Sequence, residues 1–326
     1  MAAATVDSGN IVRLVDIRKT YVTGDLQVPV LKGIDATVAR GEFVGFIGTS
    51  GSGKSTLLNI LGMLDVPTGG NYFLEEVEVG RLTDVEQATI RNRKIGFIFQ
   101  SFNLFPHLSV EENIEVPMLY ARVPGRIRRK RALELAGQVG LGHRLGHRPT
   151  QLSGGECQRI AIARALSNSP AFILADEPTG NLDEKTSDEI MKLFHELNRE
   201  QGVTMILTTH DMADIESLCS RVMLIGGGKK LLDGDISLLR KGREKRKLVC
   251  TLDRPPLQVE LAEPGLEISL KQNRLEVQFS PENTPAARLI GEISEKYGIL
   301  DMTLERTPID RVVADMYAEL AGGREA

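Results

Sequence analysis

The chain has 326 residues, a formal net charge of −4 and a hydrophobic content of 41%. The length suits one large domain with a smaller one, and the slightly acidic charge argues against a protein that mainly grips nucleic acid. No stretch approaches the roughly 18 consecutive apolar residues of a membrane-spanning helix, and we see neither a signal peptide nor a disulfide framework.

Two stretches with strand-like patterns open the chain, residues 11–17 and 28–39, and we expect them to pair in an antiparallel sheet. A buried strand, "FVGFI" at 43–47, then leads into the glycine-rich "GTSGSGKST" at 48–56 and a helix that begins near Lys54. We expect Pro67 and a turn at 68–70 ("TGG") to end this helix.

The run 48–56 fits the pattern G-x-x-x-x-G-K-[ST]. Its glycines let several backbone N–H groups turn toward an anion, the lysine reaches the β- and γ-phosphates of a nucleotide, and the hydroxyl after it ligates Mg²⁺. An ordinary flexible loop is the plain alternative, but the strand before it and the helix after it favour a phosphate cradle. The candidate nucleotide ligands are Gly48, Ser50, Gly51, Gly53, Lys54, Ser55 and Thr56, and Ser55 is also a candidate metal ligand.

Buried strands and helices alternate through the middle of the chain. Predicted strands cover 95–100, 171–177 and 203–210, and predicted helices begin at 109 and cover 127–139, 154–167 and 184–200. A hairpin with Gly226–Gly228 at its turn follows at 221–235. This alternation predicts a parallel sheet with helices on both faces, where ligands bind at the carboxyl ends of the strands. The polar residues at those ends are Gln100, Asp176, Glu177 and His210.

Two neighbouring carboxylates, Asp176 and Glu177, end one of these strands. The first can hold Mg²⁺ directly or through water, and the second can polarise an attacking water. Helix capping is the plain alternative, and the phosphate loop earlier in the chain makes it the weaker interpretation.

A second anion-binding helix end is predicted by "LSGGECQR" at 152–159. Ser153 and Glu156 have the spacing of a capping box, and Gly154 and Gly155 leave their amides uncovered. One chain with one nucleotide has no obvious use for two such ends. A head-to-tail dimer resolves this, because each phosphate loop then faces the partner's helix end with ATP between them.

The composition changes after a charged run at 241–247, which predicts a linker. Residues 248–326 contain predicted strands at 248–252, 266–270, 274–279 and 299–306, and predicted helices at 286–298 and 308–320. This pattern predicts a small α+β domain. We find no phosphate-binding or paired-acid pattern in it.

Over about residues 11–240, these motifs in this order resemble the ABC ATPases. The resemblance implies an α/β P-loop NTPase domain at 1–240, with an antiparallel β subdomain and a helical signature subdomain at about 101–168. It implies ATP and Mg²⁺ as ligands, and the following positions for the family's motifs: Walker A at 48–55, the Q-loop at Gln100, the signature at 152–156, Walker B at 172–176, the D-loop at 181–183 and the switch at His210. By the same resemblance, Lys54, Gln100, Glu177 and His210 are catalytic; Gln100 and Asp176 hold the metal; and Tyr21, Ser153, Gly154, Gly155 and Asp183 contact the nucleotide.

Finer detail is similar to the macrolide-exporter and lipoprotein-releasing branch, as in "IGFIFQSFNL" at 95–104 and "DEPTGNLD" at 176–183. Cys157 departs from the Gln that is usual there, and the tail 248–320 looks more like a small module on some drug and polysaccharide exporter ATPases. The branch implies a homodimer at the cytoplasmic face of the inner membrane, energising a membrane permease for export or for lipid or lipoprotein extraction.

Two other functions stay open at this point. One is a membrane-associated ABC machine that transports nothing. The other is a soluble ABC ATPase of DNA repair or translation, which is less favoured because the chain has one cassette and no sustained heptads.

Overall fold

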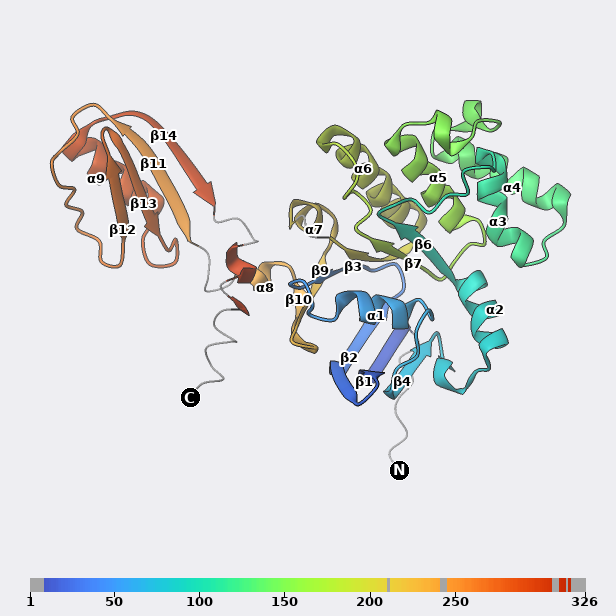
Figure 1. Cartoon of the computed structure of the whole chain (residues 1–326). Helices are drawn as coiled ribbons and strands as arrows, with labels where there is room; N and C mark the ends of the chain where they lie inside the picture. The colour runs from blue at the N-terminus through green and yellow to red at the C-terminus, as the bar shows by residue number, and fades with distance from the viewer. Residues whose placement is uncertain (1–8, 210–211, 241–244, 307–310, 315, 318–326) are drawn as a thin grey trace. The chain divides into compact units, whose positions relative to one another are not determined.

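The computed structural model describes residues 9–209, 212–240, 245–306, 311–314 and 316–317. The chain divides into two compact units, 1–234 and 235–326 (Figure 1). Each unit has its own hydrophobic core. Of the predicted linker at 241–247, residues 246 and 247 begin a strand, Arg246–Leu252, and 241–244 lie outside the described residues, so a linker at 241–245 stays a prediction.

An antiparallel sheet opens the first unit, with strands in the order β2-β1-β4-β5. The two strands predicted at the start of the chain lie within β1 and β2 and pair with each other, as expected. The strands of this sheet are β1 (Asn10–Thr23), β2 (Leu26–Ala39), β4 (Gly69–Leu74) and β5 (Val77–Glu78).

The turn predicted at 68–70 is wrong, because β4 already begins at Gly69. Gly70 has φ +84, and a Cβ there would lie only 2.2 Å from the carbonyl oxygen of Asp16 in β1. The register between the two strands also shifts between Val15 and Arg18. Gly70 therefore allows a close approach at a bulge in a strand pair, rather than a free turn.

A second sheet forms the centre of the first unit, with strands in the order β10-β9-β3-β8-β7-β6. Its pairs β3/β8, β3/β9, β7/β8 and β6/β7 are parallel, as predicted. The predicted hairpin is also confirmed: Gly227 and Gly228, both with positive φ, form the two-residue turn between β9 and β10. The strands are β3 (Phe43–Ile47), β6 (Ile95–Phe99), β7 (Phe172–Asp176), β8 (Thr204–Thr208), β9 (Arg221–Gly226) and β10 (Lys229–Asp235).

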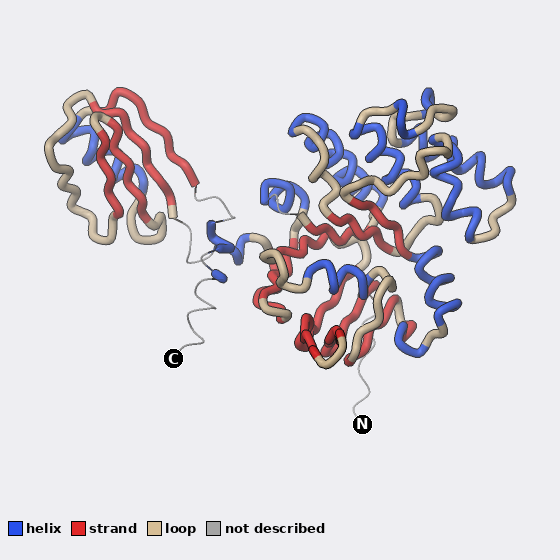
Figure 2. The backbone as a smooth tube through the Cα atoms, viewed as in Figure 1, coloured by secondary structure: helices blue, strands red, loops and turns tan. Residues whose placement is uncertain are grey.

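Helices flank these sheets (Figure 2). They are α1 (Lys54–Leu61), α2 (Asp84–Lys94), α3 (Val110–Tyr120), α4 (Gly125–Gln138), α5 (Gly154–Leu166), α6 (Glu184–Gln201) and α7 (Met212–Leu218), with short 3-10 turns at Val79–Arg81, Gly142–Arg144 and Pro149–Gln151. The capping box predicted at Ser109 is present at the start of α3. Helix α2 was not predicted, although Thr83 and Glu86 form a capping box at its start.

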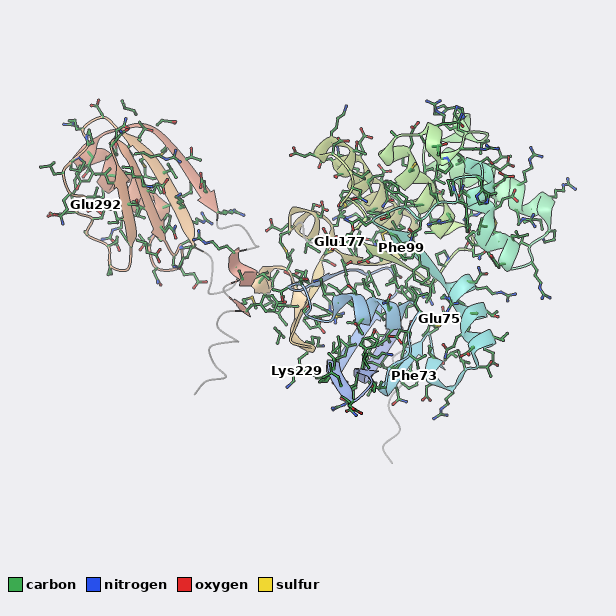
Figure 3. The ribbon with its side chains drawn as sticks, in the orientation of Figure 1. Phe73, Glu75, Phe99, Glu177, Lys229 and Glu292 are labelled. Atoms are coloured by element: carbon green, nitrogen blue, oxygen red, sulfur yellow. The ribbon has the colours of Figure 1, made fainter. Side chains whose placement is uncertain are left out.

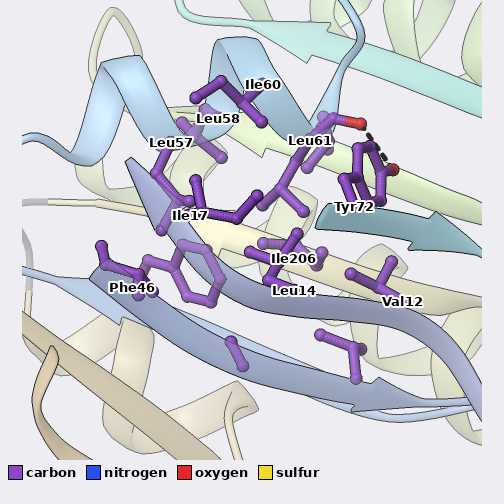
Figure 4. Packing of buried hydrophobic residues seen from close by; sticks show 14 of the residues in the cluster. Val12, Leu14, Ile17, Phe46, Leu57, Leu58, Ile60, Leu61, Tyr72 and Ile206 are labelled. Carbon is purple, nitrogen blue, oxygen red and sulfur yellow. Dashed lines mark hydrogen bonds between the residues drawn. The ribbon is translucent and has the colours of Figure 1, made fainter. Parts of the chain in front are cut away.

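The core of the first unit lies where α1 packs between strands of both sheets (Figure 4). Tyr72 of β4 is fully buried there, and its hydroxyl donates a 2.9 Å hydrogen bond to the carbonyl oxygen of Leu61. That carbonyl belongs to the last turn of α1, which has no intrahelical donor for it. The bond therefore attaches the end of α1 to the antiparallel sheet, and burial raises the pKa of the Tyr72 phenol.

The second unit has one antiparallel sheet, with strands in the order β12-β13-β11-β14. Helix α9 buries Leu289 and Ile293 in the core of this sheet. Residues 311–314 and 316–317 are helical, and the rest of the helix predicted at 308–320 lies outside the described residues. The elements are α8 (Ser237–Arg240), β11 (Arg246–Leu252), β12 (Glu267–Lys271), β13 (Arg274–Phe279), α9 (Ala286–Tyr297) and β14 (Ile299–Arg306).

The predicted fold class is confirmed by this arrangement, with a parallel sheet, an antiparallel subdomain, a helical segment and a small α+β unit. Among the helices that the structure describes, none combines the length and the apolar character needed to cross a bilayer.

Candidate functional site

The phosphate loop lies between β3 and α1, as predicted. All five residues of β3 are buried, and α1 begins directly after the loop at Lys54. Gly53 precedes the helix with φ +104 and offers no side-chain cap to its first turn. The N–H groups at the start of α1 therefore remain available to an anion.

The glycines of this loop are required for two different reasons. A Cβ at Gly48 would lie 2.5 Å from Ser52 Oγ and 2.6 Å from the carbonyl oxygen of Ile225, so close packing excludes a side chain there. Gly51 has open space around it, but its φ of +76 lies in the left-handed region. Gly53 combines both reasons, since a Cβ there would also lie 2.7 Å from Leu31.

Lys54 bends back into its own loop. Its ammonium donates hydrogen bonds to the carbonyl oxygens of Gly48 and, at 3.1 Å, of Thr49. Burial lowers the pKa of Lys54, while the nearby carboxylates of Glu177 and Asp176 act in the opposite direction. The residue is 9% exposed, so the loop encloses a cation that binds carbonyl oxygens of the loop itself.

Ser52 was not among the predicted ligands. Its hydroxyl is buried and has no hydrogen-bond partner in the described part of the chain. A hydroxyl within a glycine-rich loop was the available signal, but its burial could only come from the structure. The other predicted ligands of this loop are more open: Ser50 and Ser55 are exposed, and Thr56 is half-buried.

The β9–β10 turn contacts the phosphate loop. The N–H of Gly228 donates to the carbonyl oxygen of Ser52 at 3.1 Å, and the carbonyl oxygen of Ile225 blocks any side chain at Gly48. Two of the three glycines of the predicted hairpin, Gly227 and Gly228, have positive φ. The hairpin is therefore part of the wall of the loop.

The two carboxylates stand at the end of β7, beside the end of β6. Asp176 Oδ1 accepts a 2.6 Å hydrogen bond from the hydroxyl of Thr208, its register partner on β8. Glu177 follows with φ +46, and its N–H donates to the carbonyl oxygen of Thr208 at 2.8 Å. Figure 3 labels Glu177 and Phe99 at this edge of the sheet. Thr208 was not predicted, because only the strand register brings it to Asp176.

Gln100 lies directly after β6 and reaches the loop that follows Glu177. Its carbonyl oxygen accepts a 3.0 Å hydrogen bond from the side chain of Asn181. A Cβ at Gly180 would lie 2.6 Å from the side-chain nitrogen Nε2 of Gln100, so this glycine makes room for the Gln100 side chain. The structure thus brings the predicted Q-loop and D-loop together.

Asp183, which is predicted to contact the nucleotide, has a local structural role. It caps α6 by accepting hydrogen bonds from the N–H and the hydroxyl of Thr186, at 3.0 and 2.7 Å. Earlier in the same loop, the buried Thr179 donates a 2.8 Å hydrogen bond to Asp214 of α7. No motif in the sequence pointed to Asp214. His210 lies outside the described residues, so its predicted position is not described.

The second helix end is built as predicted. Ser153 caps α5, its N–H donates to Glu156 Oε2 at 2.9 Å, and the N–H of Glu156 donates to Ser153 Oγ at 3.3 Å. A Cβ at Gly155 would lie 2.4 Å from Cγ2 of Thr186, so packing also requires this glycine. In the part of the chain that the structure describes, no hydrogen bond joins this helix end to the phosphate loop.

Tyr21 lies on β1 with 39% of its surface exposed. Its hydroxyl donates to Asp65 at 2.8 Å, and the ammonium of Lys19 lies 4.9 Å from the centre of its ring and 2.5 Å from the same carboxylate. These contacts orient an aromatic ring that stays partly open to solvent, which suits stacking.

A groove of about 580 Å³ lies elsewhere in the first unit, between α2, β6, α3 and α5. Two arginines line it. Arg91 donates to the carbonyl oxygen of Met63 at 2.7 Å, and Arg164 donates to the carbonyl oxygens of Asn103 and, at 2.9 Å, of Phe102. None of the residues described as lining this groove is acidic. Burial lowers the pKa of Arg164 to about 10, so it remains a cation at neutral pH.

Comparison with known proteins agrees with this geometry. The model of the ABC transporter family matches residues 31–180. The lipoprotein-releasing system ATP-binding protein LolD of Geobacter metallireducens is 47% identical over 227 residues, which are 70% of this chain and 98% of that protein.

Two further proteins extend the comparison. The macrolide export ATP-binding/permease protein MacB of Syntrophobacter fumaroxidans is 51% identical over 67% of this chain, and the match spans 31% of MacB. A solved dimeric post-hydrolysis state of the ATP-binding cassette MJ0796, bound to ADP and Pi, is 43% identical with a TM-score of 0.63, over 69% of this chain and 98% of that one. Nearly a third of this chain is therefore outside each of these matches.

Proposed function

The chain belongs to the ABC transporter ATP-binding proteins, and from that premise we propose which of its residues bind and hydrolyse ATP. In this proposal the phosphate loop, Gln100, Asp176 and Glu177 of one copy form a site that the second copy completes with residues 153–155. Hydrolysis at this site energises a membrane transporter. The observation that carries the proposal is the environment of Lys54, a buried cation on carbonyl oxygens at the start of a helix that has no side-chain cap.

The phosphates of ATP fit this environment for three reasons. The start of α1 has no side-chain cap, so its N–H groups can donate to an anion. Lys54 exchanges neutral carbonyl acceptors for anionic oxygens, which form stronger hydrogen bonds. The buried hydroxyl of Ser52 gains an acceptor that none of the described residues provides.

Mg²⁺ fits the oxygen donors at the same edge of the central sheet. Ser55 supplies a hydroxyl, Asp176 a carboxylate and Gln100 an amide oxygen, and Mg²⁺ prefers such hard ligands. Thr208 orients Asp176 through its 2.6 Å hydrogen bond. When bound, the metal would neutralise charge on the phosphate oxygens.

Glu177 accepts the proton of the attacking water in this proposal, and Gln100 and His210 face the reacting phosphate. The backbone of Glu177 is held by the 2.8 Å hydrogen bond from its N–H to the carbonyl oxygen of Thr208. Glu177 has a left-handed conformation, which non-glycine residues adopt rarely. A water held between Glu177 and the phosphate loop would be in reach of both. Positioning and charge neutralisation account for most catalysis of this kind.

The second copy supplies the α5 helix end. The solved cassette that this chain resembles is dimeric with ADP and Pi, and we propose the same arrangement here, as a homodimer. Ser153, Gly154 and Gly155 then face the nucleotide held by the partner's phosphate loop, Asp183 lies in the adjoining D-loop, and Tyr21 stacks on the adenine.

The remaining partner is a membrane permease, and we place its contact at the groove between α2, β6, α3 and α5. The groove is lined by aromatic side chains and by Arg91 and Arg164, which have no carboxylate partner among the described residues. A permease segment with an apolar surface and an acidic residue would suit it. We propose that this contact holds the protein at the cytoplasmic face of the inner membrane, and that the cargo is exported or extracted, as the names of MacB and LolD say of those proteins.

A mixing experiment tests the composite site. Ser153→Arg and Lys54→Ala should each abolish ATP hydrolysis alone, because one removes the helix end and the other the lysine. Mixed, they should regain part of the activity, since each mixed dimer contains one intact site, provided that a single site can fire alone. The proposal fails if Ser153→Arg abolishes ATP binding by an isolated monomer, measured by nucleotide titration.

A further inference from the structure

The second unit has one open sheet edge. β14 pairs with β11 on one side, and no strand among the described residues pairs with its other side (Figure 1). Residues 300–306 are all exposed. Three of them are apolar and large: Leu300 is 66%, Met302 49% and Leu304 40% exposed.

Met302 and Leu304 continue the apolar face of the sheet, whereas Leu300 lies at an irregularity of the strand, next to Ile299, the register partner of Leu252. Met302 lies opposite Cys250 and Leu304 lies opposite Leu248 in the β11–β14 register. Residues directly opposite in an antiparallel pair share a face, and Cys250 and Leu248 belong to the core under α9. The core face therefore extends past the helix onto an uncovered strand.

The other edge of the same sheet is protected. β12 has five residues and charged ends, with Glu267 in a 2.8 Å ion pair with Lys245 and Lys271 at the far end. Short length and charge are common ways to keep a sheet edge from pairing. Ile268, 40% exposed, is the comparable apolar residue on this edge.

We propose that β14 of one copy pairs antiparallel with β14 of a second copy, joining two four-stranded sheets into one. A two-fold pairing centred on Met302 sets Met302 against its own twin and Leu300 against Leu304. On the opposite face it sets Asp301 against Thr303, so that a carboxylate meets a hydroxyl donor. Each of these pairs is complementary.

Neighbouring registers are worse. Centring the pair on Thr303 sets Asp301 against Glu305, and centring it on Asp301 sets two copies of that carboxylate against each other. Like charges directly opposite are destabilising. Shifts that move one strand by a single residue against the other place apolar side chains opposite polar ones. Residues 300–304 of β14 thus favour one self-pairing.

Asp301 also shields this edge while it is unpaired. Its Oδ1 accepts a 2.8 Å hydrogen bond from the N–H of Met302. Pairing exchanges that local bond for a bond between strands and releases the carboxylate toward Thr303 of the twin. Because hydrogen bonds are exchanged rather than added, the apolar contacts of Leu300, Met302 and Leu304 decide the pairing.

A second copy is the occupant because the proposed ATP-bound dimer, on which this inference rests, already holds two second units together. One strand pair buries less surface than a stable free dimer needs. Tethering raises the effective concentration to the order of millimolar, so a weak self-pairing suffices within the dimer.

Cysteine cross-linking tests the register in the full chain. Directly opposite residues have Cα atoms about 4.5–5.5 Å apart, which a disulfide can bridge, and the three native cysteines are buried. Met302→Cys should form a covalent dimer on mild oxidation, roughly tenfold or more faster than the control Ile268→Cys on the β12 edge. Leu300→Cys mixed with Leu304→Cys should cross-link as well, which covers the case that Met302→Cys misfolds.

Each reaction is run with Mg·ATP in a Glu177→Gln background, and again without nucleotide over a range of protein concentrations. Cross-links at position 302, or between 300 and 304, that exceed those at 268 in either condition support the inference. Their failure to exceed the control in both conditions overturns it. Light scattering with ATP reports separately on the ATPase dimer, so a failure of the proposed function is seen as the absence of an ATP-dependent dimer.

Discussion

Two helix N-termini in the first unit are assigned to ATP, and they are built in opposite ways. α1 follows Gly53, which has a left-handed conformation and no side chain to cap the helix. α5 follows Ser153, whose capping box with Glu156 is complete. The start of α1 keeps its amides for an anion, whereas α5 already satisfies part of its own end.

This difference indicates an order of binding. The end of α1 gains most from an anion and lies inside its own loop with Lys54, so one copy can bind the phosphates alone. The end of α5 is stable in water, and both Ser153 and Gly154 are exposed. The α5 end can therefore stay exposed without a ligand until the dimer forms and it contacts the partner's nucleotide.

The largest expected effect comes from Glu177→Gln, which should stop hydrolysis and so keep the α1 end of one copy and the α5 end of the other on the same ATP. Glu177→Gln removes the proposed base, so we expect hydrolysis to fall by roughly 10²–10⁴-fold. ATP binding at α1 should remain, and the dimer should persist with ATP. Phosphate release and light scattering measure the two effects. Turnover at the normal rate would show that Glu177 is not the base.

A second test concerns the glycines of the two ends. Gly155→Ala should destabilise the protein by about 1–3 kcal/mol, because the new methyl overpacks against Thr186. Thr186 is held in place by its two hydrogen bonds to Asp183. Adding Thr186→Ser removes the clashing methyl and keeps the hydroxyl, so it should recover most of the loss. A double-mutant cycle in urea unfolding measures this coupling.

Gly48, in the loop before α1, is the comparison for Gly155. Gly48→Ala meets the backbone oxygen of Ile225, which no side-chain substitution can remove. Gly137→Ala on α4 has open space and should be neutral or stabilise by up to about 1 kcal/mol. If Thr186→Ser recovers nothing, then packing is not the reason for Gly155.

The smallest effect concerns the charge in the capping box of α5. Hydrogen bonds from the N–H and the hydroxyl of Ser153, with the nearby charge of Arg144, lower the pKa of Glu156. A lowered pKa in the folded state adds stability above the unfolded-chain value of 4.5, and this stability is lost as pH falls through the folded pKa.

Glu156→Gln keeps the capping geometry without the charge. At neutral pH the variant should be less stable than the natural chain by under about 1 kcal/mol, because the group is near the surface. The difference should vanish on acidification. Urea unfolding at a series of pH values measures it, and a difference that grows in acid would contradict the assignment. No such dependence is expected from the start of α1, which has no acidic residue in its first turn.

Local signals in the sequence predicted much of the fold. Hydrophobic runs gave the parallel strands, and the capping boxes at Ser109 and Ser153 marked two helix starts that the structure confirms. The error at the turn 68–70 has a non-local cause, since only the approach of β1 shows why Gly70 is needed. The same capping signal precedes α2 at Thr83. This helix was missed because none of its residues is buried, so its sequence has no clear apolar face.

The residues of the site also divide into those that local spacing predicted and those that only the fold reveals. The phosphate loop is one contiguous stretch, so Lys54 and its glycines could be predicted from spacing. Thr208 lies 32 residues from its partner Asp176, and Asp214 lies 35 residues from its partner Thr179. Only strand register and loop packing bring such pairs together, and spacing within a motif carries no trace of them.

The contact between Ser52 and Gly228 has a mechanical consequence. The hairpin that touches the phosphate loop continues through β10, which ends at Asp235, where the second unit begins. Only residues 229–234 therefore separate Gly228, in the wall of the nucleotide loop, from the start of the attached unit. A shift of the loop must either break the 3.1 Å bond at Gly228 or pull on that strand. A domain appended at this point is thereby joined to the loop by a short tether, whatever its own role.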